Sequence, residues 1–135
     1  MRMLHSSAAD EPEVEVNQAD QANINRFSNL NVQYEELEAK LQAKKDELDY
    51  LSELETDLMM LDDDELVMYK LETSLVHMTP AKATELNERN QKKLSDTVDR
   101  LQADLEKCDE EMSQLKKLLY KKFGNTINLE RNEPA

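Results

Sequence analysis

Two stretches of the 135-residue chain repeat apolar residues at alternating steps of three and four, and this repeat limits the fold more than any other feature. The first seam consists of Phe27, Leu30, Tyr34, Leu37, Leu41, Leu48, Leu51, Leu54, Leu58 and Leu61, with Lys44 at the skipped position. The second consists of Leu94, Val98, Leu101, Leu105, Cys108, Met112, Leu115 and Leu119. Such steps place side chains along one helix face and are typical of coiled coils. Each stretch therefore predicts a long helix.

The first predicted helix covers residues 19–62, and Asp20 is its expected N-cap. An acidic run at residues 62–65 is expected to end it, because carboxylates oppose the negative end of the helix dipole. The alternative for this run is a calcium-binding EF-hand loop. Its required glycine at the sixth position and glutamate at the twelfth are missing, so we interpret the run as a solvated turn.

The second predicted helix covers residues 80–123, opened by Thr79 as N-cap with Pro80 at the first helical position. Gly124 is expected to end it. Two helices of nearly equal length with a short connector are expected to pack antiparallel. The predicted fold class is therefore mainly α: a long antiparallel two-helix coiled coil with one β-hairpin at the connection.

That hairpin is predicted in segment 63–79, where valine, tyrosine and threonine make the chain most strand-like. We place strands at residues 67–71 and 75–78, with a three-residue turn at 72–74. Apolar residues fall on both faces, so the hairpin is not expected to be stable alone and should assemble with other chains. The candidate assembly residues are Leu66, Val67, Met68, Tyr69, Leu71, Leu75, Val76 and Met78.

The far end of the coil, where the two termini should meet, is rich in apolar residues. Residues 1–18 are interpreted as disordered and residues 124–135 as a tail. Two interpretations stay open and can hold together: the apolar residues close the coil, or they form an exposed patch that binds proteins. The candidates are Ile24, Phe27, Leu118, Tyr120, Phe123, Ile127 and Leu129.

The charge of the chain limits its partners. A formal net charge of −13 repels nucleic-acid phosphates and anionic membranes, so we expect neither as a partner. Cys108 is the only cysteine, which excludes an intrachain disulfide and fits a reducing compartment. No apolar run approaches the ~20 residues of a membrane span. We therefore expect a cytoplasmic protein.

Residues for catalysis are not grouped along the sequence. His5 and His77 have no second ligand at a spacing that would form a metal site with them. Cys108 falls on the second seam with no histidine at helical spacing, which favours core packing over a nucleophile. A glycine-rich phosphate loop is also missing. We expect no enzymatic activity, no catalytic residues, no cofactor and no metal.

Two strings of residues make the chain resemble the beta-type subunits of prefoldin, and the resemblance runs from residue 20 to residue 131. The first string is Asp20-Gln21 followed by Ile24-Asn25-Arg26-Phe27. The second is Leu119-Tyr120-Lys121-Lys122-Phe123-Gly124-Asn125 followed by Ile127-Asn128-Leu129-Glu130-Arg131. The Asp-rich run followed by Tyr69 is also similar.

The resemblance implies a cytosolic, ATP-independent chaperone of two alpha-type and four beta-type subunits. Their hairpins would join into a β-barrel platform. Coiled-coil tips would hold unfolded actin and tubulin and deliver them to the cytosolic chaperonin. Implied partners are thus the other prefoldin alpha- and beta-type subunits, these clients and the chaperonin. The rival interpretation is a structural or tethering coiled coil with one dedicated partner, and a homo-oligomer is a third.

The sequence departs from the family at the hairpin turn. Similar subunits have a Gly-Asp pair there, whereas this chain has Glu72-Thr73. A turn that needs φ > 0 would be strained at Glu72, because side chains other than glycine rarely adopt that conformation.

Overall fold

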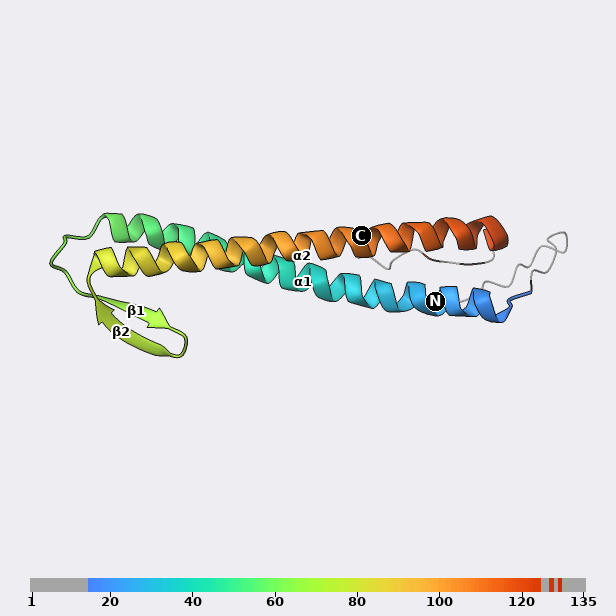
Figure 1. The fold of residues 1–135 in the computed structure, drawn as a ribbon, viewed down its shortest axis with the longest axis horizontal. Helices are drawn as coiled ribbons and strands as arrows, with labels where there is room; N and C mark the ends of the chain where they lie inside the picture. Colours follow the sequence, from blue (N-terminus) through green and yellow to red (C-terminus); the bar gives the residue numbers. More distant parts are fainter. Residues whose placement is uncertain (1–14, 125–126, 128, 130–135) are drawn as a thin grey trace. The chain divides into compact units, whose positions relative to one another are not determined.

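The computed structural model describes residues 15–124 together with residues 127 and 129. The elements in chain order are α1 (Gln18–Met59), β1 (Val67–Leu71), β2 (Ser74–Met78) and α2 (Pro80–Phe123) (Figure 1). Two long helices with an antiparallel hairpin between them confirm the predicted order of elements. Most of the predicted N-terminal disordered segment and of the C-terminal tail lies outside the described residues.

Helix α1 begins two residues before the expected N-cap, so the assignment of Asp20 as that cap is wrong. The N-cap is Asn17, whose Oδ1 accepts a hydrogen bond from the Asp20 N–H at 2.8 Å. In return, Asp20 Oδ2 accepts from the Asn17 N–H at 3.1 Å. This reciprocal pair is a capping box, with Asp20 at its third helical position. Asn17 and Asp20 are both residue types that favour an N-cap, and in the structure Asn17 occupies that position.

Helix α1 also ends earlier than predicted, at Met59 instead of residue 62. The N–H of Met60 donates to the Asp57 carbonyl at 3.2 Å, and the Leu61 N–H donates to the Leu58 carbonyl at 3.3 Å. These bonds to the third preceding residue tighten the last turn and use carbonyls that would otherwise lack partners. The acidic run therefore lies wholly in the connector, beyond the end of the helix.

Helix α2 has the predicted bounds and the predicted caps. The Thr79 hydroxyl accepts from the Lys82 N–H at 3.3 Å. Thr79 also provides the carbonyl that accepts the first helical bond, from the Ala83 N–H at 3.0 Å. At the other end Gly124 has φ +57°, the left-handed conformation that lets glycine turn the chain after a helix.

The chain forms two compact units. Among the described residues, unit 1 joins residues 15–38 with residues 103–124, 127 and 129, and unit 2 consists of residues 39–102. Each helix contributes to both units. Every seam position predicted on the two helices is buried or half-buried, including Lys44, which confirms the heptad pattern.

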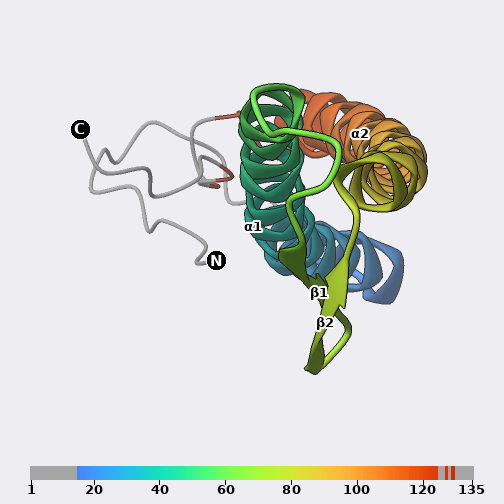
Figure 2. The ribbon, with the colours of Figure 1, turned by 90° about the vertical axis from the view of Figure 1, so that its left-hand side faces the viewer.

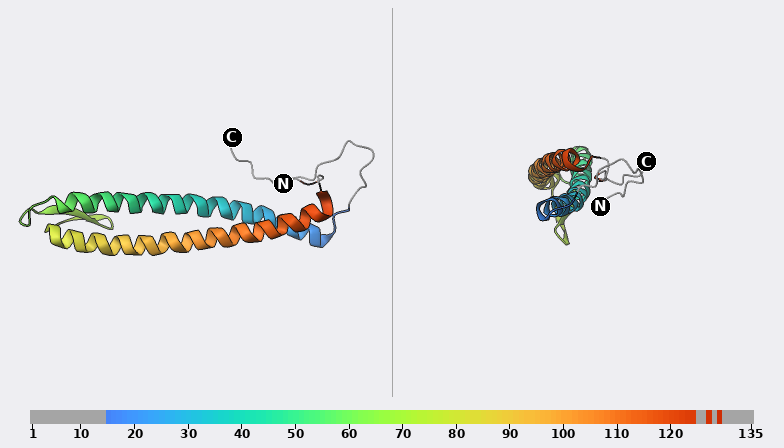
Figure 3. Two further views of the ribbon diagram at one scale, coloured as in Figure 1. Left: turned by 90° about the horizontal axis from the view of Figure 1, so that it is seen from above. Right: turned by 90° about the vertical axis from the view of Figure 1, so that its right-hand side faces the viewer.

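Within unit 1 the first turns of α1 lie beside the last turns of α2 (Figure 3). Asp20 of α1 forms an ion pair with Lys122 of α2. Further along α1, the Leu30 carbonyl oxygen accepts a hydrogen bond from Cys108 Sγ of α2 at 3.3 Å. The later residue of α1 thus has the earlier partner in α2, so the two helices run antiparallel within unit 1. Cys108 is buried on this seam, where the sequence places it.

Within unit 2 the hairpin lies alongside the last turns of α1 and the first turns of α2 (Figures 1 and 2). Leu58, near the end of α1, packs in one cluster with Ala83, near the start of α2, so these segments are antiparallel as well. The strands pair antiparallel, with Val67 opposite Met78 and Leu71 opposite Ser74. The predicted three-residue turn is therefore wrong by one residue, because Ser74 belongs to β2.

Candidate functional site

The hairpin turn consists of two residues, Glu72 and Thr73. Glu72 has φ +52°, and among the described non-glycine residues it alone has positive φ. The positive φ from which strain at Glu72 is expected is thus present. A two-residue hairpin needs positive φ at its first central position to follow the twist of the strands. The chain forms this turn without the glycine that best tolerates it.

The inner face of the hairpin is fixed on the helices by a small apolar cluster. Its buried members are Tyr69 of β1, Met78 of β2, Leu58 of α1 and Ala83 of α2. Partly buried side chains pack around them: Leu54, Leu61, Val67 and Leu86. Three of the eight candidate assembly residues, Val67, Tyr69 and Met78, are therefore used inside the chain.

The outer face of the hairpin is exposed and carries both apolar and polar residues. Strand residues alternate between faces, so Met68 and Lys70 of β1 share the face opposite Tyr69. Their cross-strand partners are His77 and Leu75. Five candidate assembly residues are exposed: Leu66, Met68, Leu71, Leu75 and Val76. Met68 and Leu75 lie on the outer face, whereas Leu71 and Val76 share the face of Tyr69 and Leu66 precedes β1.

A two-stranded sheet also has a free backbone edge on each strand. Water-exposed apolar side chains beside unpaired backbone groups suit pairing with a strand from another chain. The outer face of the hairpin therefore has the properties of an assembly surface.

A second apolar cluster lies in unit 1, and we call it the unit 1 cluster. Its buried members are Ile24, Phe27, Leu30, Cys108, Met112, Leu119, Phe123, Ile127 and Leu129. Partly buried residues pack against it: Tyr34, Leu37, Leu115 and Tyr120. Five of the seven candidate tip residues are thus buried, which favours for those five the interpretation that they close the coil. Client binding by the seven stays a prediction.

Residues after Gly124 contribute to this burial. Ile24 and Phe123 lie outside the heptad seams predicted from the sequence, and Ile127 and Leu129 are buried in the same cluster. The Leu129 N–H donates to the Tyr120 hydroxyl at 3.3 Å. Of the seven candidates only Leu118 is exposed, with 53% of its surface accessible.

Two ion pairs join α1 to α2 in unit 1. Arg26 Nε lies 2.9 Å from Glu111 Oε1, and Nη2 lies 3.1 Å from Oε2. The hydrogen bonds from Arg26 lower the pKa of Glu111, and the same bonds raise the pKa of Arg26. The pKa of Asp20 is lowered chiefly by its hydrogen bond from Lys122, assisted by the Asn17 N–H. These pairs link α1 to α2 in unit 1 and match their register.

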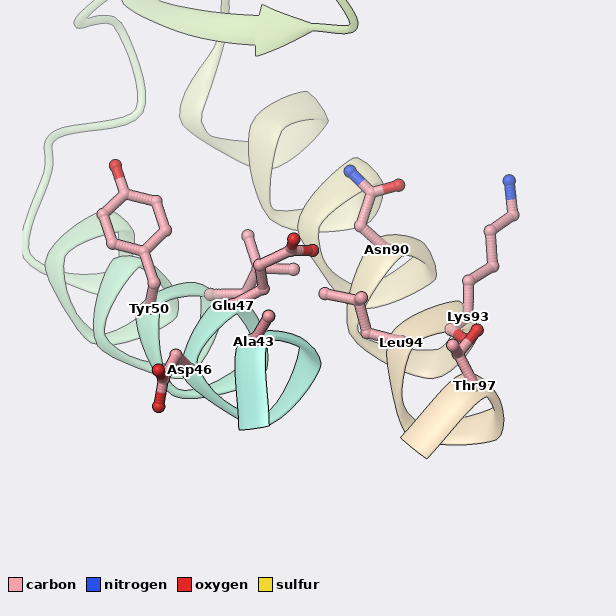
Figure 4. Close-up of a pocket in the computed structure, with 9 residues that line it drawn as sticks. Ala43, Asp46, Glu47, Tyr50, Asn90, Lys93, Leu94 and Thr97 are labelled. Atoms are coloured by element: carbon pink, nitrogen blue, oxygen red, sulfur yellow. The ribbon is translucent and has the colours of Figure 1, made fainter. Parts of the chain in front are cut away.

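Unit 2 contains an open groove of about 740 Å³ between α1 and α2. Figure 4 shows Ala43, Glu47 and Tyr50 on one side and Asn90 and Leu94 on the other. Asp46, Leu51, Lys93 and Thr97 complete the lining. The lining lacks cysteine, serine and histidine, so it offers no thiol, serine hydroxyl or imidazole for nucleophilic catalysis.

The described residues contain neither a group suited to hold a metal ion nor a helix suited to cross a membrane. Among residues 15–124, 127 and 129, no three His, Cys, Asp or Glu side chains are grouped so that they could hold a metal ion. Within the same part of the chain, neither helix has an apolar stretch suited to crossing a bilayer.

One set of polar residues in unit 2 was not predicted from the sequence. Asn87 is completely buried and Asn90 is half-buried, and both bind the Tyr69 hydroxyl. A signal was present, since Asn87 lies seven residues before the seam residue Leu94 and so continues the seam with a polar side chain.

Comparison with known proteins gives one consistent result. A sequence model described as "Prefoldin subunit" matches residues 21–126. Prefoldin subunit 4 of Saccharomyces cerevisiae is 32% identical over 112 residues, covering 83% of this chain and 87% of the relative. Prefoldin subunit 4 of Homo sapiens is 32% identical over 131 residues, covering 96% of both chains. The probable prefoldin subunit 4 of Dictyostelium discoideum is 34% identical over 118 residues, covering 87% of this chain and 89% of the relative.

A solved structure is similar in fold. The prefoldin beta subunit from Thermococcus strain KS-1 superposes with a TM-score of 0.73. The superposition covers 83% of this chain and 98% of the other, at 18% sequence identity.

Proposed function

The chain belongs to the prefoldin subunit family, a family of chaperone subunits, and from this premise we propose its role in detail. It is a beta-type subunit of a hetero-hexameric, ATP-independent co-chaperone in the cytoplasm. The complex holds unfolded actin and tubulin and delivers them to the cytosolic chaperonin. The observation that carries the proposal is the exposure of Met68 and Leu75 on the outer face of the hairpin, on a chain whose relatives are prefoldin subunits.

Assembly uses the hairpin. Met68 and Leu75 lie on the outer face and are exposed, so a neighbouring hairpin buries them without disturbing the inner cluster. Each buried apolar square ångström contributes roughly 25 cal/mol. Backbone pairing at the free edges of β1 and β2 adds direction to that contact. Hairpins from other alpha- and beta-type subunits supply the partner strands of a β-barrel platform.

Client holding uses the unit 1 cluster. Leu118 is exposed and provides the first contact with apolar client surface, beside the half-buried ring of Tyr120. Ile24, Phe27 and Phe123 reach a client only when Ile127 and Leu129 leave them, because all five are buried together. Each contact is small. Several subunits contacting one client reach useful affinity through effective concentration, and the contacts stay reversible for transfer to the chaperonin.

The acidic character of the chain supports this role. Its net charge of −13 keeps the helices soluble and limits adhesion of a held client along their length. It also favours basic client segments by electrostatic complementarity.

The assembly part of the proposal is tested by placing charges on the outer face. The double variant Met68→Asp/Leu75→Asp should abolish co-assembly with the other subunits, measured by native mass spectrometry. The matched control is Val32→Asp, because Val32 is 55% exposed on α1 in unit 1. A double variant that still forms the complex with normal mass would refute the proposed assembly surface.

The client part is tested separately in the assembled complex. Leu118→Asp should raise the chaperone concentration needed to suppress aggregation of unfolded actin by roughly twofold to fivefold, since one of several weak contacts is lost. Val32→Asp is again the control. Unchanged suppression by the Leu118 variant would refute this assignment while leaving assembly intact.

A structural tether with one dedicated partner is the rival. Purification through this chain distinguishes the two. Five further small coiled-coil subunits in equal amounts support the chaperone, whereas one partner of a different kind supports the tether.

A further inference from the structure

A buried polar contact ties the hairpin to both helices of unit 2. The Tyr69 hydroxyl of β1 donates to Asn87 Oδ1 of α2 at 3.1 Å. Asn87 Nδ2 in turn donates to the Leu51 carbonyl oxygen of α1 at 2.9 Å. The Tyr69 hydroxyl also accepts from Asn90 Nδ2 at 3.2 Å. We call Tyr69, Asn87, Asn90 and the Leu51 carbonyl the hairpin clasp.

The clasp lies where a coiled coil would normally place an apolar residue. Tyr69 is 5% exposed and Asn87 is fully buried, at a seam position between Ala83 and Leu94. A buried asparagine at a seam position is less stabilising than leucine, but it can specify register, because its amide needs one particular set of partners. Here the Asn87 amide is satisfied on both sides, by β1 through its oxygen and by α1 through its nitrogen.

The clasp also involves only one of the two faces of β1, the face that carries Tyr69. Residues alternate along β1, so a shift of one residue would bring Met68 inward and expose Tyr69. Apolar packing against Leu58 and Met78 has no direction and tolerates sliding. A hydrogen bond is directional and short-ranged, so the Tyr69 hydroxyl would lose its hydrogen bonds to Asn87 and Asn90 in the shifted arrangement.

We propose that Tyr69 and Asn87 are positioning residues, which orient the hairpin on the helices so that its outer face is aligned for pairing with neighbouring subunits. This inference rests on the proposed assembly through the hairpin. It predicts two separate effects of breaking the clasp: looser hairpin amides in the chain itself, and weaker association with partners.

The first test replaces Tyr69 by phenylalanine, which keeps the ring and removes the hydroxyl. In the full-length chain, amide hydrogen exchange in β1 and β2 should become roughly tenfold faster, because the buried Asn87 oxygen loses its donor. Association with the partner subunits should weaken by roughly the same factor. Tyr50→Phe is the matched control, since Tyr50 on α1 is 65% exposed. It should change neither quantity.

A second variant separates positioning from support of the helices. Asn87→Leu replaces an amide by an apolar side chain at a seam position, so the thermal melting of the helices should be unchanged or higher. Hairpin exchange should still accelerate and association should still weaken. The double variant Tyr69→Phe/Asn87→Leu should be no worse than either single variant, because both remove the same bond.

The outcomes separate this inference from the proposed function. If the unaltered chain assembles and Tyr69→Phe matches it in exchange and association, the clasp has no positioning role. An Asn87→Leu chain that loses helical stability together with association would also overturn the inference, since support of the helices would then explain both losses. If the unaltered chain forms no complex, the proposed function fails. The positioning role of Tyr69 and Asn87 is then tested by amide exchange alone, and unchanged exchange of the hairpin amides in Tyr69→Phe would refute it.

Discussion

Arg26 and Glu111 form a two-pronged ion pair across 85 positions of sequence, with Nε 2.9 Å from Oε1 and Nη2 3.1 Å from Oε2. The planar guanidinium matches the carboxylate in this geometry, which fixes relative position as well as charge. Both side chains are about half exposed, so the pair specifies the register of α1 against α2 in unit 1 more than it adds stability.

Acidification is expected to weaken helix pairing in unit 1. The pKa of Glu111 is lowered by Arg26, and the pKa of Asp20 is lowered by Lys122. A carboxylate with a lower pKa in the folded chain stabilises it above the unfolded pKa, and this contribution is lost as pH falls through the folded pKa. The melting temperature of the full-length chain should therefore start to fall below about pH 4.5, measured by circular dichroism.

Glu111→Gln provides the control for that pH dependence. The variant is less stable than the unaltered chain at neutral pH, and the gap should close as pH falls, because protonated Glu111 also lacks its charge. Glu110→Gln, at an exposed neighbouring position, should show no such gap. A gap for Glu111→Gln that stays constant with pH would contradict the assignment.

Phe27→Ala is expected to lower the free energy of unfolding by about 3 to 5 kcal/mol. Phe27 is buried in the unit 1 cluster among residues of both helices, so truncation leaves a cavity. Urea denaturation of the full-length chain measures the loss. Val32→Ala, on the exposed side of the same helix, should stay within about 0.5 kcal/mol. Equal effects of the two variants would mean that the cluster is not packed.

Glu72→Gly is expected to stabilise the hairpin. Positive φ costs a non-glycine residue about 1 to 2 kcal/mol, and glycine removes this cost from the folded chain. The greater conformational freedom of glycine in the unfolded chain offsets about 0.4 to 1 kcal/mol of that stabilisation. Amide exchange in β1 and β2 should slow by roughly twofold to fivefold. Thr73→Gly should have the opposite sign, because Thr73 does not adopt positive φ. Faster exchange in Glu72→Gly would show that the turn carries no strain.

Asn17→Ala is expected to destabilise the start of α1 by about 1 kcal/mol, since the Asp20 N–H loses its acceptor. Exchange of amides in the first turn of α1 should accelerate. Asn17→Asp retains a capping oxygen and should restore protection, and Gln18→Ala should have little effect. If Asn17→Asp behaves like Asn17→Ala, the cap is not formed through this side chain.

The seams were predictable because helical periodicity is a local property. Leu30, Leu58, Cys108 and Leu119 recur at steps that depend only on the number of residues per turn, and all four are buried. The caps of α2 are equally local, since Thr79 and Gly124 act on backbone groups within a few residues. The cap of α1 was misassigned because Asn17 and Asp20 are both good caps, and only the completed reciprocal pair distinguishes them.

The unit 1 cluster was predictable in membership but not in exposure. Phe27 and Phe123 have apolar side chains that can either pack inside the coiled coil or bind a partner protein. The spacing of residues in the sequence does not distinguish these two possibilities. The choice depends on Ile127 and Leu129, which pack on the helices after the turn at Gly124. Leu118 lies next to Leu119 along the chain and is nevertheless exposed, because successive helical residues point to different faces.

From its residues alone the chain determines two long helices, the strand-like segment between them and a surface that repels anions, because periodicity, capping and charge act over a few residues. Only the tertiary structure decides that Tyr69 and Asn87 share a buried bond while Met68 faces solvent. That decision requires β1, α1 and α2 to meet in space. A polar side chain becomes a specific contact only where distant parts of the chain enclose it and supply its partners.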